Sequence, residues 1–157
     1  MDITGIKIKT ERLILKLISN DYIEEIDTEI ILNITRYMKL NSDEKNETSE
    51  QIIQKSLEEM KKGNILQMVI VEKASNEFIG LIGLYEINTL EPFLEIWTKK
   101  EARKNGYGLE AMNGLLEWVD KNIKFKNIYY SFRKKNIIKI KEPEKNIGYK
   151  ILGKNEI

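Results

Sequence analysis

The sequence predicts an α+β fold, a mixed α/β arrangement in which helices flank one twisted and mostly antiparallel sheet. A chain of 157 residues suits one compact domain, and a hydrophobic fraction of 41% is that of a globular protein. Runs with strand patterning and runs with helical periodicity share the chain, with two helices near the start and one before the last strands. No repeat or low-complexity linker divides it, so residues 1–157 are expected to form a single domain.

The N-terminal third predicts a strand and two helices. Residues 6–18 alternate at first and then become apolar, which favours a strand with a break near Thr10 and Glu11. Apolar side chains recur at spacings of three and four over residues 20–39, so a helix is expected there. A polar loop and a second helix over residues 49–62 follow, and a Gly-Asn pair ends that helix.

The middle of the chain predicts a three-stranded meander. Two β-rich runs, at residues 65–73 and 78–87, are separated by a short turn that contains Asn, which is typical of an antiparallel hairpin. A third strand over residues 93–98 follows a proline, and a strongly periodic helix over residues 109–123 comes after a glycine-containing loop. Residues 127–133 predict the next strand.

The C-terminal segment predicts less regular structure. Residues 136–146 are expected to form a weak helix or a turn, because Pro143 would interrupt a longer helix. Residues 148–153 predict one last short strand. The expected order is therefore a strand, two helices, a meander, a loop and helix, a strand, and a short irregular end.

The residue types that the chain lacks exclude several kinds of catalysis. It contains no Cys, which rules out disulfides, thiol nucleophiles and thiolate zinc sites. It contains no His, which rules out Ser-His triads and the His-containing zinc-hydrolase motif. No metal site is therefore expected, and any catalytic group must be a carboxylate, Tyr, Lys, Ser, Thr or a backbone dipole.

Hydropathy and charge bear on location and partners. The chain has no run of about 18 apolar residues and no secretion signal, so we expect no membrane span and a cytoplasmic location. Residues 1–120 carry 15 Lys and Arg against 22 Asp and Glu, whereas residues 121–157 carry 11 against 3. We interpret the basic end as a solvated lysine-rich surface. An RNA- or ribosome-associated module is the alternative, and nucleic acid is not the expected partner.

A glycine-containing loop at residues 103–108 joins a strand to a long helix and predicts a diphosphate site. Gly106 and Gly108 lack a β-carbon, so a ligand can approach the backbone closely. The first turn of the following helix offers unpaired N–H groups and the positive end of the helix dipole, and Arg103 and Lys104 add positive charge. A turn whose glycines only fit the strand-to-helix corner is the structural alternative.

The same residues also fit a dinucleotide-binding pattern. Residues 106–111 read Gly-x-Gly-x-x-Ala, and Arg133 ends the next strand, where an NADP enzyme would hold a 2′-phosphate. That fold needs further parallel βαβ units, yet only about 24 residues follow Arg133, and the strands before the loop predict a hairpin meander. The dinucleotide site is therefore the less favoured interpretation.

Residues 94–120 resemble the central region of the GNAT acetyltransferases, most closely the ribosomal-protein-alanine N-acetyltransferase type. The loop motif of that family, [Arg/Gln]-x-x-Gly-x-[Gly/Ala], is matched by Arg103, Gly106 and Gly108. Further segments that resemble the family lie on both sides of the loop: Thr10-Glu11-Arg12-Leu13, Glu110-Ala111, Asn136, Pro143-Glu144-Lys145 and Gly148-Tyr149. The resemblance therefore spans nearly the whole chain in the right order.

The resemblance implies that acetyl-CoA is the co-substrate and that its acetyl group passes directly to a primary amine, from a peptide N-terminus or a small molecule. In this family the fourth strand separates from the fifth, the pantetheine arm pairs with the fourth strand, and loop amides hold the diphosphate. These roles fall on Ile96, Trp97 and Thr98 in the strand and on Arg103, Lys104, Asn105, Gly106, Tyr107 and Gly108 in the loop. The resemblance also implies that Asn136 touches the pantetheine arm or the far end of the cofactor.

The acceptor amine must be neutral to attack, so its pKa decides how much a base has to contribute. At pH 7 neutralising a peptide α-amine costs roughly 1 kcal/mol, whereas a lysine amine costs roughly 4.6 kcal/mol. Because related enzymes often place Glu on this strand, Glu95 is the expected catalytic base, with Glu86 as second choice. A solvent-facing or ion-paired Glu95 is the alternative. Tyr130 and Tyr149 are the candidates for the general acid.

Three departures from the family pattern leave a second function open. Glu95-Ile96 runs directly into Trp97, so two residues are missing where the fourth strand usually bulges. Lys139 stands where Ser is common, and the chain stops at Ile157, so the last strands would be short or missing and a sheet edge exposed. Homodimerisation is the hypothesis that follows from this edge. A degenerate domain that binds CoA or a partner without turnover is the alternative function.

Overall fold

The structure is a computed structural model that describes residues 2–30, 48–132 and 136–146. Its strands form one eight-stranded sheet in which sequence order and spatial order coincide. Neighbouring strands run antiparallel except the fifth and sixth, which run parallel. The strands are β1 (Lys7–Lys9), β2 (Leu13–Leu17), β3 (Ile65–Glu72), β4 (Phe78–Tyr85), β5 (Phe93–Thr98), β6 (Ile128–Phe132), β7 (Asn136–Glu142) and β8 (Lys145–Asn146).

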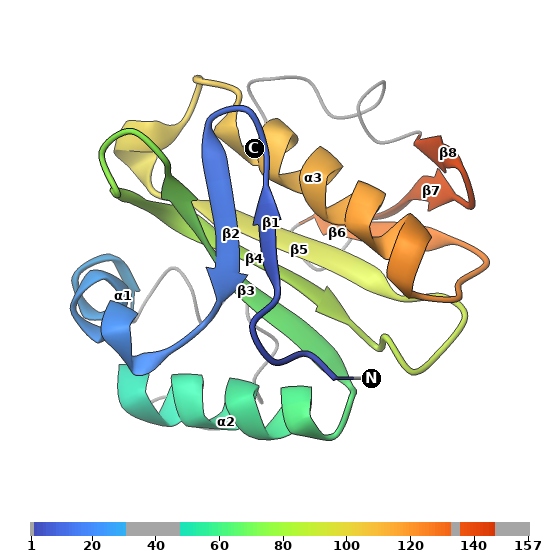
Figure 1. Ribbon diagram of the computed structural model, residues 1–157, viewed down its shortest axis with the longest axis horizontal. Helices are drawn as coiled ribbons and strands as arrows, with labels where there is room; N and C mark the ends of the chain where they lie inside the picture. Colours follow the sequence, from blue (N-terminus) through green and yellow to red (C-terminus); the bar gives the residue numbers. More distant parts are fainter. Residues whose placement is uncertain (1, 31–47, 133–135, 147–157) are drawn as a thin grey trace.

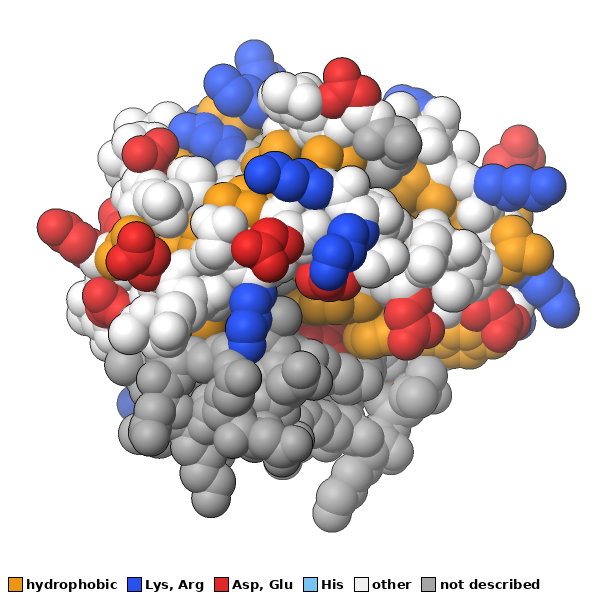
Figure 2. All heavy atoms as spheres, turned by 90° about the horizontal axis from the view of Figure 1, so that it is seen from below, with side chains coloured by type: hydrophobic (Ala, Val, Ile, Leu, Met, Phe, Trp, Pro, Cys, Tyr) orange, Lys and Arg blue, Asp and Glu red, His pale blue; other side chains and the backbone are white. Residues whose placement is uncertain are grey.

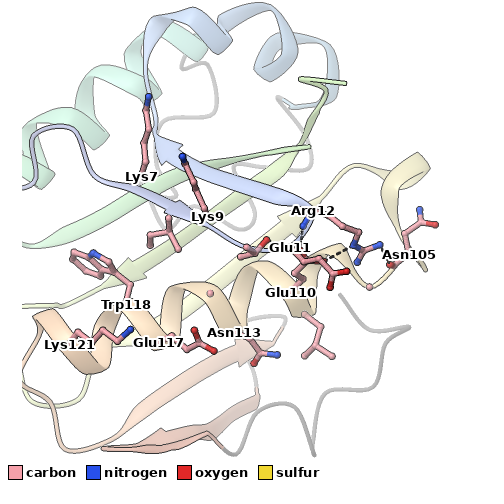
Figure 3. A pocket seen from close by; sticks show the side chains of 15 residues that line it. Lys7, Lys9, Glu11, Arg12, Asn105, Glu110, Asn113, Glu117, Trp118 and Lys121 are labelled. Carbon is pink, nitrogen blue, oxygen red and sulfur yellow. Dashed lines mark hydrogen bonds and ion pairs between the residues drawn. The ribbon is translucent and has the colours of Figure 1, made fainter. Parts of the chain in front are cut away.

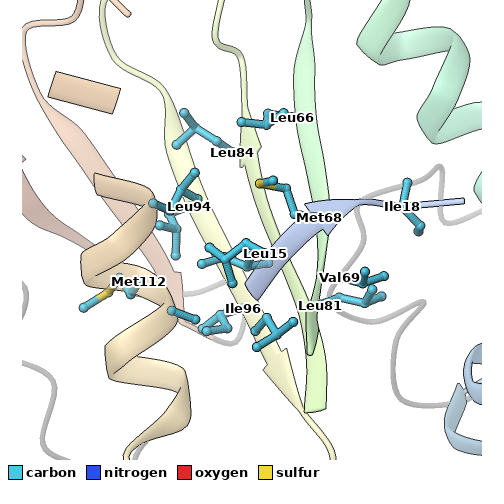
Figure 4. Packing of buried hydrophobic residues seen from close by; sticks show 14 of the residues in the cluster. Leu15, Ile18, Leu66, Met68, Val69, Leu81, Leu84, Leu94, Ile96 and Met112 are labelled. Carbon is cyan, nitrogen blue, oxygen red and sulfur yellow. The ribbon is translucent and has the colours of Figure 1, made fainter. Parts of the chain in front are cut away.

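Helices flank this sheet, which confirms the predicted α+β fold (Figure 1). In the described ranges they are the short 3-10 helices η1 (Asn20–Tyr22) and η2 (Lys100–Ala102) and the helices α1 (Ile23–Ile30), α2 (Ser49–Lys61) and α3 (Tyr107–Asn122). Met112 of α3 packs with Leu94 and Ile96 of β5 in the apolar core on one face (Figure 4). On the other face the ring of Phe78 lies 6.1 Å from that of Tyr22, so η1 and the start of α1 belong to that side.

The start of α2 is fixed by the hydrogen bonds of its capping residue, Thr48. α2 starts after Thr48, whose hydroxyl accepts a hydrogen bond from the Gln51 amide, while the Gln51 side chain accepts one from the Thr48 amide. This reciprocal cap satisfies two amides that the first turn of a helix leaves unpaired. The helix predicted over residues 20–39 is confirmed as far as Ile30, and its remainder lies outside the described residues.

The break predicted near Thr10 is a reversal of the chain. β1 and β2 pair antiparallel. The Leu13 amide donates to Thr10 Oγ1 at 3.0 Å, and the Thr10 amide donates to the Leu13 carbonyl at 3.0 Å. These two bonds close a tight turn, so residues 6–18 form a hairpin where one interrupted strand was expected. Arg12 stands at its tip.

The prediction of a weak helix or turn over residues 136–146 is wrong, because this segment forms β7 and β8. Ile and Lys alternate over residues 138–141, as suits a strand, and this strand pairs with β6 on one side and β8 on the other. Pro143 lies in the turn between β7 and β8, where a fixed φ is tolerated. β7 covers the edge of β6. Homodimerisation through an exposed sheet edge stays a prediction. The last short strand predicted over residues 148–153 lies outside the described residues.

A buried ion pair fastens the β7–β8 hairpin to α3. Lys141 Nζ lies 2.5 Å from Asp120 Oδ2, and the side chain of Lys141 is only 3% exposed. The Glu144 amide donates to Asp120 Oδ1 at 3.1 Å. Asp120 therefore neutralises a lysine that water does not reach and also fixes the hairpin turn.

Asp120→Ala is expected to lower the free energy of unfolding by about 3 kcal/mol, because it leaves the buried Lys141 ammonium without its partner. Urea unfolding followed by circular dichroism measures the change. Glu142→Ala is the matched control, since it removes the exposed Lys139–Glu142 pair of the same hairpin and should lower the free energy of unfolding far less than Asp120→Ala does. Equal losses in the two variants would contradict a structural role for the Asp120 pair.

β5 separates from β6 after two paired residues. The parallel pairing joins Phe93 to Tyr129 and Leu94 to Tyr130, whereas β5 pairs with β4 as far as Thr98. The pairing of β4 with β5 is regular, and the irregularity in this part of the sheet lies between β3 and β4. The two residues missing from β5 therefore leave it without a bulge, yet among the described residues its second half has no pairing with β6.

The surface on the α2 side carries both signs of charge. Figure 2, which views the molecule from below Figure 1, shows Lys and Arg side chains interspersed with Asp and Glu side chains. Neither sign of charge dominates among the described side chains in this view. Within the described ranges, none of the helices combines the length and the apolar character that crossing a bilayer demands.

Candidate active site

Two residues in the left-handed region determine the conformation of the loop after β5. Lys104 and Gly106 have φ angles of 69° and 77°, and Gly106 is the N-cap of α3. A lysine in this region costs roughly 1–2 kcal/mol, so other contacts must hold the loop. Arg103 Nε donates to the Thr98 carbonyl at 3.0 Å, and the Asn105 side-chain amide donates to a carbonyl of η2 at 3.1 Å. The loop is thereby tied to the end of β5.

The N-terminus of α3 has the features of an anion-binding site. Gly106 has no side chain to cap the helix, and the Glu110 amide donates to the Gly106 carbonyl at 3.1 Å. The amides before Glu110 consequently have no acceptor within the helix. Among the described residues, a β-carbon added at Gly106 would come within 4 Å of Arg12 Nη2 alone, at 3.6 Å, so the backbone is accessible there. This geometry suits a diphosphate.

The tip of the β1–β2 hairpin lies against this N-terminus (Figure 3). Arg12 Nε donates to Glu110 Oε2 at 2.7 Å, and Arg12 Nη1 donates to the Asn105 carbonyl at 3.0 Å. The Thr10 hydroxyl donates to Glu110 Oε1 at 2.6 Å. The sequence predicts no contact between Thr10, Arg12 and Glu110, which it shows only as members of family motifs. The signal that could have paired them is their presence in two motifs of that one family.

An open groove of about 890 Å³ runs between β1 and α3 and reaches the loop (Figure 3). Basic side chains stand on both walls, with Lys9 on β1 and Lys121 on α3, and Trp118 adds an aromatic surface. Of the predicted cofactor residues, only Asn105 and Gly106 line it. The groove is therefore a different surface from the β5 segment expected to hold the pantetheine arm.

Successive residues of β5 face opposite sides of the sheet. Glu95 stands opposite Gly83 of β4, and Trp97, two residues on, shares its face. Ile96 points to the other face, where it packs near α3 (Figure 4). The main chain from Ile96 to Thr98 lies beyond the last residue that β5 pairs with β6. The predicted base and the predicted pantetheine contacts thus belong to one strand segment, with the side chains of Glu95 and Trp97 on one face of the sheet and that of Ile96 on the other.

Glu95 is buried, with 7% of its surface exposed, so it is not a solvent-facing strand residue. Burial raises the pKa of Tyr85, and the charge of the nearby Glu95 carboxylate raises it further. The Tyr85 hydroxyl donates to Gln67 Oε1 at 2.8 Å, and its ring stacks on Phe93 with centroids 5.3 Å apart. Glu95 is therefore buried near an aromatic hydroxyl, and burial is one condition for a carboxylate base with a raised pKa.

The other predicted residues are more scattered. Glu86 is exposed in the turn after β4, away from the apolar surroundings that a base needs. Tyr130 is buried in β6 opposite Leu94. Asn136 begins β7, and Tyr149 lies outside the described residues. In the part of the chain that the structure describes, no three acidic side chains gather as a metal site would require.

A family model described as an acetyltransferase (GNAT) domain matches residues 12–146. The match begins at Arg12, at the tip of the first hairpin, and extends to the end of β8. It includes the whole of the loop and α3. Among curated proteins, none matches this sequence.

Solved structures of several acetyltransferases share the fold. A putative ribosomal-protein-serine acetyltransferase from Vibrio cholerae is 21% identical, with a TM-score of 0.64 over 80% of this chain and 73% of that chain. A spermidine N-acetyltransferase from Vibrio cholerae, in complex with CoA and spermine, is 19% identical, with a TM-score of 0.61 over 76% and 70%. A GNAT-family acetyltransferase from Bacillus anthracis is 16% identical, with a TM-score of 0.61 over 80% and 72%. At these identities the likeness shows a common fold.

Proposed function

This chain belongs to the GNAT acetyltransferase family and is an acetyl-CoA-dependent N-acetyltransferase, and we propose that its acceptor is a peptide N-terminus or a small-molecule amine bound on the Glu95 side of β5. The observation that carries the proposal is the buried Glu95 carboxylate, located where β5 has separated from β6. A carboxylate at that point attracts an ammonium group and can accept its proton. The names of two similar solved structures indicate a ribosomal protein and the polyamine spermidine as substrates of those proteins, which supports an amine acceptor here.

Several groups of this chain fit acetyl-CoA. The amides at the start of α3 are available to a diphosphate, Gly106 presents no β-carbon, and Arg103 and Lys104 supply positive charge. The main chain of Ile96–Thr98, beyond the pairing with β6, can bond the amides of the pantetheine arm. When bound, acetyl-CoA supplies the thioester whose carbonyl carbon the amine attacks.

Glu95 takes the proton that the acceptor ammonium must lose before its nitrogen can attack. For a peptide α-amine this deprotonation costs roughly 1 kcal/mol at pH 7, which a single carboxylate can offset. For a lysine side chain it costs roughly 4.6 kcal/mol, and a polyamine demands a similar contribution. The proposed mechanism therefore favours a peptide N-terminus at neutral pH.

At pH 7 a peptide with a free N-terminus is expected to be acetylated about 400-fold faster than the same peptide with a blocked N-terminus and one lysine, because the two deprotonation costs differ by roughly 3.6 kcal/mol. The ratio should fall as the pH rises, because the neutral fraction of the lysine amine increases about tenfold per pH unit. CoA release, measured with a thiol-reactive dye on both peptides and on spermidine, tests this. Saturable acetyl-CoA binding without turnover on any amine would favour the degenerate alternative.

A further inference from the structure

Three donors converge on the carboxylate of Glu110. The Thr10 hydroxyl and the Arg12 amide donate to Oε1 at 2.6 Å and 2.7 Å, and Arg12 Nε donates to Oε2 at 2.7 Å. The Glu110 side chain is 17% exposed, so water screens these charge-assisted bonds only in part. Gly114 makes the approach of the hairpin possible, because a β-carbon there would lie 2.6 Å from Thr10 Cγ2.

The same guanidinium holds the loop on both sides of Gly106. Arg12 Nη1 donates to the Asn105 carbonyl, which lies between the two left-handed residues Lys104 and Gly106. The guanidinium carbon also lies 4.4 Å from the ring centroid of Tyr107, the first residue of α3. One side chain from the tip of the β1–β2 hairpin therefore contacts the residues that precede and follow the N-cap of α3.

Glu110 keeps its charge at neutral pH. Burial alone would raise the pKa of Glu110, but hydrogen bonds from the Thr10 hydroxyl, the Arg12 amide and the Arg12 guanidinium hold it below its usual value. Stabilisation by a carboxylate with a lowered pKa is present at neutral pH and is lost as the pH falls through that lowered value. A negative charge thus stands in the first turn of α3, close to where a diphosphate would bind, and Arg12 is the cation that balances it.

We propose that Arg12 and Glu110 are positioning residues for the diphosphate loop, a role that rests on the proposed use of this loop by acetyl-CoA. Their ion pair holds residues 104–107 in the conformation that presents the α3 amides to the diphosphate. Arg12 has a second effect, because it neutralises Glu110. Removing Arg12 is consequently more harmful than removing the charge of Glu110, and removing both restores part of the affinity.

The test compares Arg12→Gln, Glu110→Gln and the double variant by calorimetric titration with acetyl-CoA. Arg12→Gln should raise the dissociation constant about 20-fold and Glu110→Gln about fivefold, since charged hydrogen bonds of this kind are lost. The double variant should resemble Glu110→Gln, which non-additive coupling of paired residues requires. Arg12→Lys, which keeps the charge but loses the planar fork, should fall between the parent and Arg12→Gln.

A truncated donor separates positioning from a general structural role. S-acetylpantetheine carries the same thioester without a diphosphate, so its kcat/KM should stay within about twofold in Arg12→Gln, and kcat with saturating acetyl-CoA should change little. Lys62→Gln is the matched control, because it removes the Lys62–Glu59 pair of equal length, 2.7 Å, beside the end of α2. Its affinity for acetyl-CoA should equal that of the parent.

A folded Arg12→Gln variant with parental affinity would overturn the proposal, and so would an equal loss of kcat/KM with both donors. If Arg12→Gln does not fold, Glu110→Gln decides, since parental affinity in that folded variant contradicts the role of the pair. Failure of the parent protein to bind acetyl-CoA is a different result, which refutes the use of the loop by the cofactor and not the contacts of Arg12.

Discussion

Gly106→Val is expected to weaken acetyl-CoA binding about 100-fold, equivalent to roughly 3 kcal/mol. Gly106 has a φ of 77°, a conformation in which a β-branched side chain is strained. The added side chain would also project beside the first amides of α3, where it would hinder charge-assisted hydrogen bonds to a phosphate worth roughly 1.5–3 kcal/mol each. Isothermal titration calorimetry with acetyl-CoA measures the change in dissociation constant.

Gly63 supplies a control for the backbone contribution. Its φ of 76° is nearly that of Gly106, it follows α2, and beyond its chain neighbours no described atom would lie within 4 Å of an added β-carbon. Gly63→Val should therefore lose roughly 1–2 kcal/mol of stability from backbone strain, while acetyl-CoA affinity stays at the parental value. A folded Gly106→Val variant that binds acetyl-CoA like the parent would show that the loop is only a structural turn.

Glu95→Gln is expected to lower kcat about 100- to 1,000-fold and to leave the dissociation constant of acetyl-CoA within about twofold. Glutamine has nearly the same shape and can keep the packing near Tyr85 and Phe93, but its amide cannot take a proton from the acceptor ammonium. The substitution also removes one cause of the raised pKa of Tyr85. Steady-state kinetics with a peptide α-amine, measured between about pH 6 and pH 9, bracket the titration of that amine.

Glu86→Gln is the control for this substitution. Glu86, the second candidate for the base, is exposed in the turn after β4. Its replacement should therefore leave turnover and the pH–rate profile unchanged. Parental kcat and an unaltered pH–rate profile in Glu95→Gln would remove Glu95 as the base. A loss of kcat in Glu86→Gln alone would transfer the role to Glu86.

Elements with a strong local pattern were predicted closely. β5 spans the predicted residues 93–98, because a proline precedes a run of β-forming side chains. α3 begins two residues before the predicted 109–123 and ends one residue earlier, since its apolar periodicity is sustained over four turns. In both cases the signal lies within the element itself.

Elements whose structure depends on a distant partner were predicted less well. Residues 138–141 alternate between Ile and Lys, which suits a strand, but Pro143 favours an interrupted helix. Pairing with β6 and the ion pair between Lys141 and Asp120 stabilise the strand, and neither contact can be read from the segment. The hairpin turn at Thr10 was likewise seen as a break, because strand propensity does not distinguish a bend from a reversal.

The diphosphate loop is predictable from local features alone, because two glycines, two cations and a helix N-terminus lie close together in the sequence. The contact of Arg12 with Glu110 is not, since 98 residues separate them and the packing of the β1–β2 hairpin on α3 brings them together. The tertiary structure also decided that Glu95 is buried, because the register of β5 against β4 selects the face to which each side chain points. Short-range spacing specifies what a segment can bind, whereas sheet register and packing specify which distant side chains share its site.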